Sequence, residues 1–96
     1  MKKEVIVISA IWCPSCLILN KNLKKLNKEY PEVQINKLDY DLDEEEVTEY
    51  NVGTKLPVIV IKENDKETNR LIGEKTYEEI IEFLKEGNII WKGNLY

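Results

Sequence analysis

The residues of this sequence with the clearest chemical meaning are its two cysteines, Cys13 and Cys16, which are separated by Pro14 and Ser15. Thiols three positions apart lie on the same face of a helix and can close a disulfide without a movement of the backbone. A cysteine at the start of a helix faces unsatisfied backbone N–H groups and the positive end of the helix dipole, and both stabilise a thiolate. Such a thiolate attacks a partner disulfide, and a neighbouring thiol then resolves the mixed disulfide. The pair is therefore predicted to be catalytic, with Cys13 as the nucleophile and Cys16 as the resolving thiol.

The composition argues against several other chemistries. The 96 residues include 14 Lys or Arg, 18 Asp or Glu and no His, with a formal net charge of -4. The negative balance disfavours nucleic acid as a ligand, because phosphate binding requires clustered cationic side chains. Without histidine the chain lacks imidazole general bases and most zinc and haem ligands. No metal or cofactor is therefore expected, unless two chains share zinc or an iron–sulfur cluster through their cysteines.

The elements that position the cysteines follow from the apolar pattern of the first half of the chain. A run of β-branched residues over 5–10 predicts a central strand that is covered on both faces. From Pro14 the pattern becomes helical over 14–28, with leucines on one face and lysines on the other, and Pro31 lies just past the end. A second strand is predicted over 33–38. The cysteine pair therefore falls at the joint between a buried strand and a helix.

An acidic stretch over residues 39–49 follows the second predicted strand. Asp41 and Glu44 have the spacing of a capping box, and acidic side chains in a first turn favour the positive end of the helix dipole. The stretch is therefore interpreted as the solvated start of a short helix, with an acidic patch for a partner as the alternative.

The second half of the chain predicts a hairpin and a last helix. Strands are expected over 58–61 and 70–72. Thr76 and Glu79 form a second capping box before an amphipathic stripe, and Gly87 ends that helix. The element order is therefore β-α-β-α-β-β-α.

The motif Trp12-Cys13-Pro14-Ser15-Cys16 at a strand-to-helix joint, together with Leu56-Pro57 before the third strand, resembles the thioredoxin superfamily over roughly residues 5–86. The resemblance implies an α/β fold of the minimal thioredoxin type, with a four-stranded mixed sheet and helices on both faces. The first two strands should be parallel and the last two antiparallel. One domain is expected over residues 1–96, with a short C-terminal extension over 87–96.

The resemblance also implies a substrate-binding surface around the cysteines. In that family the proline before the third strand is cis and packs against the cysteines, and the preceding backbone pairs with the substrate chain. The tryptophan before the first cysteine is partly exposed and contacts partners. The residues to which a substrate-binding role is carried over are Trp12, Pro14, Ser15, Leu56, Pro57 and Gly73.

The sequence departs from the family pattern at two places that bear on mechanism. Val7 stands where thioredoxins have a buried Asp that assists proton loss from the second cysteine, although Lys37 matches the lysine that partners this Asp. Cys16 is therefore expected to lose its proton by another route, such as water. The segments at 55–57 and 72–75 match poorly the patterns with which glutaredoxins bind glutathione.

These observations predict a thiol–disulfide oxidoreductase that reduces protein disulfides and is re-reduced by a thioredoxin reductase. The alternatives are a glutaredoxin-like reductase that uses glutathione and a dimeric module bridged by a metal or cluster. The chain has no run of about 20 apolar residues that could cross a membrane. It also has no small-residue cleavage site before Cys13. A cytoplasmic monomer that binds neither membrane nor nucleic acid is therefore expected.

Overall fold

The helices and strands follow one another in the order that the sequence predicts. The structure, a computed structural model, describes residues 3–90. Within this range no helix is long and apolar enough to cross a membrane. The elements are β1 (Lys3–Ser9), α1 (Pro14–Glu29), β2 (Ile35–Asp39), α2 (Glu44–Glu49), β3 (Val58–Glu63), β4 (Lys66–Ile72) and α3 (Tyr77–Glu86).

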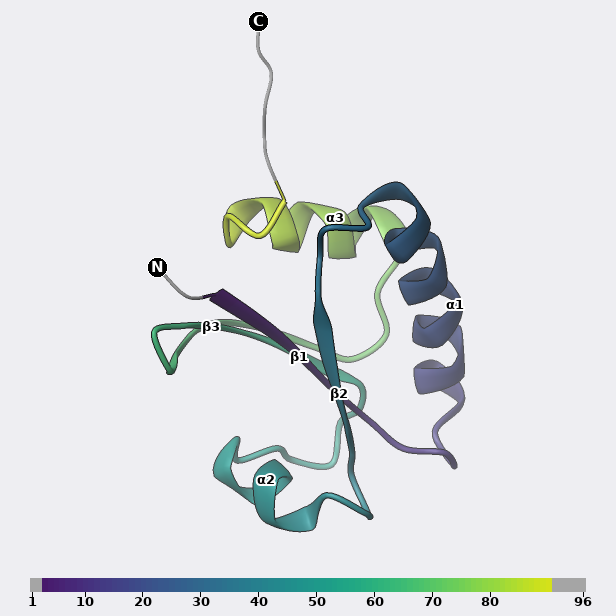
Figure 1. The fold of residues 1–96 in the computed structure, drawn as a ribbon. Helices are drawn as coiled ribbons and strands as arrows, with labels where there is room; N and C mark the ends of the chain where they lie inside the picture. The colour runs from purple at the N-terminus through teal and green to yellow at the C-terminus, as the bar shows by residue number, and fades with distance from the viewer. Residues whose placement is uncertain (1–2, 91–96) are drawn as a thin grey trace, which may run out of the picture.

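The four strands form one mixed sheet in the order β2-β1-β3-β4, with β1 in its interior (Figure 1). β1 runs parallel to β2, and Val5 is the partner of Ile35 in that register. β3 is antiparallel to both β1 and β4. The predicted parallel first pair and antiparallel last pair are confirmed. The sheet thus holds the end of β1, which leads into the cysteines, between two hydrogen-bonded neighbours.

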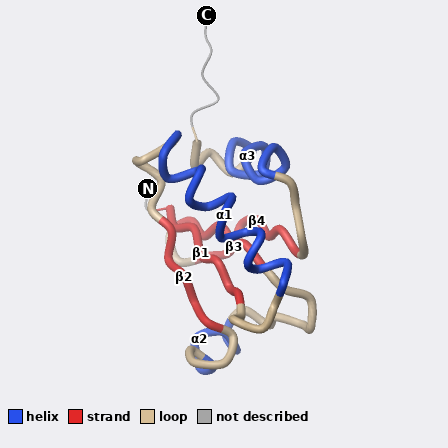
Figure 2. The backbone as a smooth tube through the Cα atoms, turned by 90° about the vertical axis from the view of Figure 1, so that its right-hand side faces the viewer, coloured by secondary structure: helices blue, strands red, loops and turns tan. Residues whose placement is uncertain are grey.

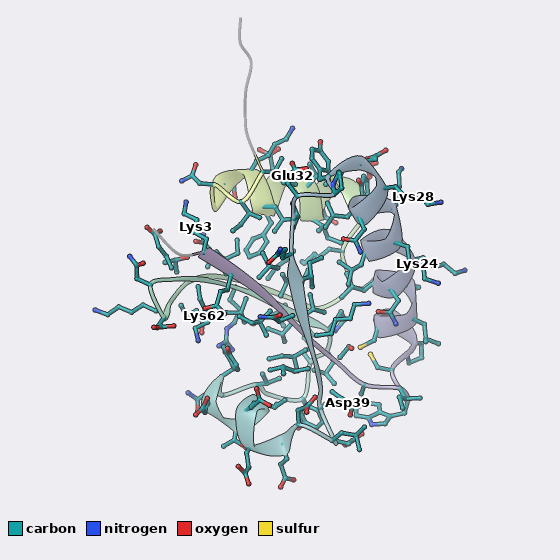
Figure 3. The ribbon with its side chains drawn as sticks, in the orientation of Figure 1. Lys3, Lys24, Lys28, Glu32, Asp39 and Lys62 are labelled. Carbon is teal, nitrogen blue, oxygen red and sulfur yellow. The ribbon has the colours of Figure 1, made fainter. Side chains whose placement is uncertain are left out.

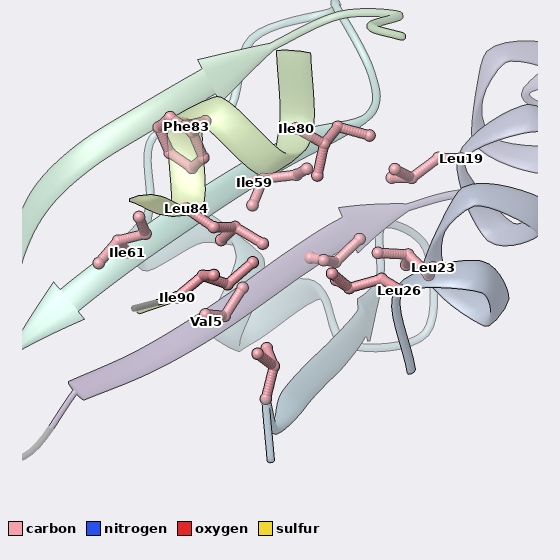
Figure 4. Packing of buried hydrophobic residues seen from close by; sticks show 12 residues of the cluster. Val5, Leu19, Leu23, Leu26, Ile59, Ile61, Ile80, Phe83, Leu84 and Ile90 are labelled. Atoms are coloured by element: carbon pink, nitrogen blue, oxygen red, sulfur yellow. The ribbon is translucent and has the colours of Figure 1, made fainter. Parts of the chain in front are cut away.

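Both faces of the sheet are covered, as the apolar run of β1 predicts. Val5 lies in a cluster with side chains of α1 and α3 (Figure 4). Val7 belongs to the same cluster. Ile6 and Ile8, on the other face, pack with Val47 of α2. Figure 2 shows α1 and α3 together and α2 apart from them. This arrangement confirms the minimal thioredoxin fold and explains why β1 lacks the polar alternation of a one-sided strand.

Strand β4 is longer than predicted. It begins at Lys66 rather than at residue 70, because a tight turn at Asn64 and Asp65, both with positive φ, starts the hairpin early. Its first half is exposed and polar, as is typical of an edge strand, so it carries no apolar signal. The length of the strand is set by its pairing with β3 and not by its own composition.

The capping box predicted at Asp41 and Glu44 is wrong. Helix α2 begins at Glu44 with Asp43 as its N-cap residue, and no side chain caps it. The carboxylate of Asp43 instead accepts a hydrogen bond from the backbone N–H of Asp39 at 2.8 Å. The box at Thr76 and Glu79 is confirmed, with both of its hydrogen bonds present.

The chain after α3 packs back onto the core as far as the structure describes it. The backbone N–H of Ile89 donates to the carbonyl of Leu84 at 2.8 Å, and the side chain of Ile90 is buried in the cluster under α1 and α3. The rest of the predicted extension, over 91–96, lies outside the described residues.

The packing of α1 predicts which of its leucines carry stability. Leu23 is 2% exposed and Leu17 is 56% exposed on the same helix. Leu23→Ala should lower the free energy of unfolding in urea by about 3 kcal/mol, because it leaves a cavity in the core. Leu17→Ala is the matched control and should change it by less than about 0.5 kcal/mol. Equal effects of the two substitutions would contradict the packing described here.

Candidate functional site

Cys13 occupies the N-cap position of α1. Its backbone is extended, with φ of -97° and ψ of 112°, and its Sγ accepts a hydrogen bond from the backbone N–H of Cys16 at 3.3 Å. Pro14 follows in the first turn, where its missing N–H costs nothing. Figure 3 shows the sulfur atoms beside the start of α1. The expected placement of the thiol among the free N–H groups at the start of a helix is therefore confirmed.

Cys16 has a different environment from Cys13. Both are free thiols, and the exposed fraction is 1% for Cys16 and 6% for Cys13. Burial raises the pKa of Cys16 to about 12, and its hydrogen bond with Cys13 adds to the shift. Cys16 is therefore a thiol near neutral pH. The two thiols therefore differ in their surroundings, one at the start of the helix and one buried within its first turn.

In the described part of the chain, no buried acid lies beside Cys16. Val7 is buried in the apolar cluster between the sheet and helices α1 and α3, and it pairs in register with the exposed Lys37. Among residues 3–90 no polar or charged residue is classed as buried. The absence of the Asp noted in the sequence is therefore not compensated by another buried carboxylate in the described part of the chain.

The segment before β3 lies against the dithiol. The Leu56–Pro57 peptide bond is cis, as the resemblance implies. Leu56 belongs to the same buried cluster as both cysteines, and it takes no part in the sheet ladder. The backbone N–H of Gly73, whose φ of +89° favours glycine, donates to the carbonyl of Pro57 at 2.8 Å. The fold thus joins these three predicted substrate-binding positions, which are far from the cysteines in sequence.

Trp12 is held on the surface beside the dithiol. It is 60% exposed, and its indole Nε1–H donates to Oδ2 of Asp41 at 2.7 Å. The ring of Tyr40 meets it edge-on, with ring centroids 6.2 Å apart. Asp41 therefore orients a residue of the motif instead of capping α2. Sequence reasoning missed this role, because the spacing to Glu44 gave Asp41 a local explanation.

Ser15 is also held by an acidic side chain. Its hydroxyl donates to Oε1 of Glu74 at 2.9 Å, across 59 positions of sequence. Glu74 directly follows Gly73 and is exposed. Neither residue carries a sequence signal for this contact, which arises only when the loop after β4 meets the start of α1.

The reactive groups of this site are the two thiols, and exposed apolar side chains surround them in the sequence. Three exposed apolar side chains, those of Ile11, Trp12 and Ile72, are adjacent in sequence to residues of the site. Within residues 3–90, no group of three or more His, Cys, Asp or Glu side chains is arranged to hold a metal ion. The hollow of about 430 Å³ beside α2 is lined by Tyr40, Asp41 and neighbouring residues and not by either cysteine.

Comparisons with known proteins agree with this geometry. The sequence model of the family described as Thioredoxin matches residues 1–86. Thioredoxin H8 of Arabidopsis thaliana is 34% identical over 77 residues, which are 80% of this chain and 51% of the relative. Thioredoxin H5 of Oryza sativa is 32% identical over 72 residues, which are 75% of this chain and 53% of the relative.

This chain therefore spans about half the length of these two plant relatives. A solved structure, that of Fasciola hepatica thioredoxin, superposes with a TM-score of 0.79 at 30% identity, over 88% of this chain and 80% of the other. The matched sequence model and the shared fold, with its cis proline and dithiol, show that this chain belongs to the thioredoxin family.

Proposed function

We propose that this protein is a thiol–disulfide oxidoreductase that reduces protein disulfides through a cycle between a Cys13–Cys16 dithiol and a Cys13–Cys16 disulfide. The observation that carries the proposal is the position of Cys13. Its sulfur lies at the N-cap of α1, accepts an N–H hydrogen bond and has a second buried thiol one turn away. Membership of the thioredoxin family supports the same activity.

The first step is attack on the substrate. The Cys13 thiolate attacks one sulfur of a substrate disulfide, a new S–S bond forms between them, and the other substrate sulfur leaves as a thiolate. The backbone N–H groups at the start of α1 stabilise the attacking anion beforehand. The product of this step is a mixed disulfide between Cys13 and the substrate.

The second step releases the substrate. The sulfur of Cys16 attacks Cys13, the Cys13–Cys16 bond forms, and the bond from Cys13 to the substrate breaks. Cys16 loses its proton in this step, and the departing substrate thiolates take up protons to become thiols. The enzyme dithiol is thereby oxidised by two electrons and the substrate disulfide is reduced by two. Within residues 3–90 no buried carboxylate can take this proton, because Val7 stands in the place of the acid.

A protein substrate suits the exposed surface around the dithiol. Trp12 and Ile11 project from the loop before Cys13, and Leu56 lies outside the ladder of β3, where a substrate strand would pair. A thioredoxin reductase is the proposed electron donor, on the strength of relatives named as thioredoxins. The cycle itself requires no cofactor beyond the two cysteines.

The proposed roles of Cys13 as the nucleophile and Cys16 as the resolving thiol can be tested with insulin as the substrate. Reduction coupled to a thioredoxin reductase and NADPH should proceed with the wild type, and Cys13→Ser should lower the rate at least about a hundredfold, because the nucleophile is absent. Cys16→Ser should instead accumulate a mixed disulfide with insulin, visible by mass spectrometry without reductant. Turnover with glutathione but not with the reductase would reassign the electron donor. Turnover with neither would refute the proposed activity.

The pH dependence of Cys16 provides a second test. Its pKa is raised above the ordinary value of 9.0, chiefly by burial, so the reactive thiolate is scarce below that pH and forms only as the pH rises further. In Cys13→Ala the burial remains, and the rate of alkylation by iodoacetamide should still be rising at pH 10. The control is the same variant unfolded in urea. Its rate of alkylation should stop rising just above the ordinary thiol pKa of 9.0. If the folded and the unfolded variant gave the same pH profile of alkylation, the buried environment assigned to Cys16 would be wrong.

A further inference from the structure

Two carboxylates border the dithiol, and each is fixed by a residue of the motif itself. Oδ2 of Asp41 accepts a hydrogen bond from the indole of Trp12, the residue before Cys13. Oε1 of Glu74 accepts one from the hydroxyl of Ser15, the residue before Cys16. The two acids come from different loops, after β2 and after β4. Each acid is thus joined by a hydrogen bond to the residue that precedes one of the two cysteines.

Within residues 3–90, neither carboxylate forms an ion pair with a lysine or arginine. Their hydrogen-bond donors, an indole and a hydroxyl, are neutral. The ion pair found among residues 3–90 joins Arg70 to Glu67, so no lysine or arginine there neutralises Asp41 or Glu74. Lys75 follows Glu74 in the chain but forms no ion pair with it. Asp41 and Glu74 are also exposed, so a substrate side chain can reach them.

We propose that Asp41 and Glu74 are specificity-determining residues that favour disulfides flanked by lysine or arginine and disfavour disulfides flanked by acidic residues. The proposal rests on the proposed reductase activity. Charges that are held in place by hydrogen bonds discriminate between partners more effectively than freely rotating ones, because less side-chain entropy is lost on binding. Glutathione disulfide carries more carboxylates than amines, so it should be a disfavoured substrate.

The surroundings of the two acids define the rest of the preferred segment. Leu42 follows Asp41 and is largely exposed, and Ile72 lies two positions before Glu74 and is partly exposed. An apolar side chain therefore accompanies each carboxylate. A segment that combines basic with apolar side chains around its cysteine would satisfy both features, since the basic groups pair at the rim while apolar surface is buried beside Trp12.

The experiment compares two synthetic peptide disulfides that differ only in the residues flanking each cysteine, lysine in one and glutamate in the other. The wild type should show a higher kcat/KM for the lysine peptide, and the ratio should fall as sodium chloride is raised from 0.05 to 0.5 M. Glu74→Gln and Asp41→Asn should each lower the ratio about threefold, as expected for removal of an exposed charge pair, and the double variant about tenfold.

Matched variants separate charge from structure. Glu86→Gln removes one negative charge at the far end of α3 and should leave the ratio unchanged. Glu74→Asp keeps the charge and should keep most of the preference. A wild-type ratio near one, or a ratio unaffected by both neutral variants, would overturn the specificity proposal. A third peptide, flanked by alanine, tests the activity itself: its reduction by the wild type but not by Cys13→Ser supports the reductase independently of the ratio.

Discussion

The hydrogen bond from the backbone N–H of Cys16 to the sulfur of Cys13 is the interaction on which the site depends. It exists because α1 begins immediately after Cys13, and α1 begins there because β1 delivers the chain to that point. β1 is buried on both faces and paired on both edges, so its end has little freedom. The N–H of Cys13 then donates to the carbonyl of Ala10, which turns the chain into the helix. A sheet buried on both sides thus positions one sulfur atom.

The same packing gives the two thiols different surroundings. Cys13 accepts a hydrogen bond from a backbone N–H at the helix N-terminus, whereas burial raises the pKa of Cys16. Val7 lies in the apolar core, and residues 3–90 contain no buried carboxylate that could accept the proton of Cys16. In the proposed cycle, the backbone N–H groups at the start of α1 stand beside the attacking sulfur where an imidazole could otherwise assist. Resolution is the step that the raised pKa of Cys16 opposes, because Cys16 must then lose its proton.

The sequence predicted the parts of this structure that rest on strong local patterns. β1, α1 and the capping box at Thr76 follow from apolar periodicity and capping chemistry, which act over a few residues. The cis bond at Pro57 followed from the family resemblance, since residue propensities alone favour trans. The start of β4 and the contacts of Asp41 and Glu74 were not predictable. They are fixed by pairing and loop approach across the fold, for which an exposed polar residue gives no signal.

The residues whose positions could be predicted are the cysteines of the proposed reaction. The residues whose contacts could not be predicted are the acids of the proposed substrate preference. Cys16 lies in α1 and Cys13 is the N-cap residue of that helix, so the regular backbone of one element positions both sulfurs. The acids lie on loops, and neither is hydrogen-bonded to a cysteine. A carboxylate in contact with a sulfur would oppose the thiolate that attack requires. Held instead by Trp12 and Ser15, the acids can act on the flanks of a substrate before and after exchange alike. Interactions of that kind change how readily a substrate is captured and not the rate of exchange once it is bound.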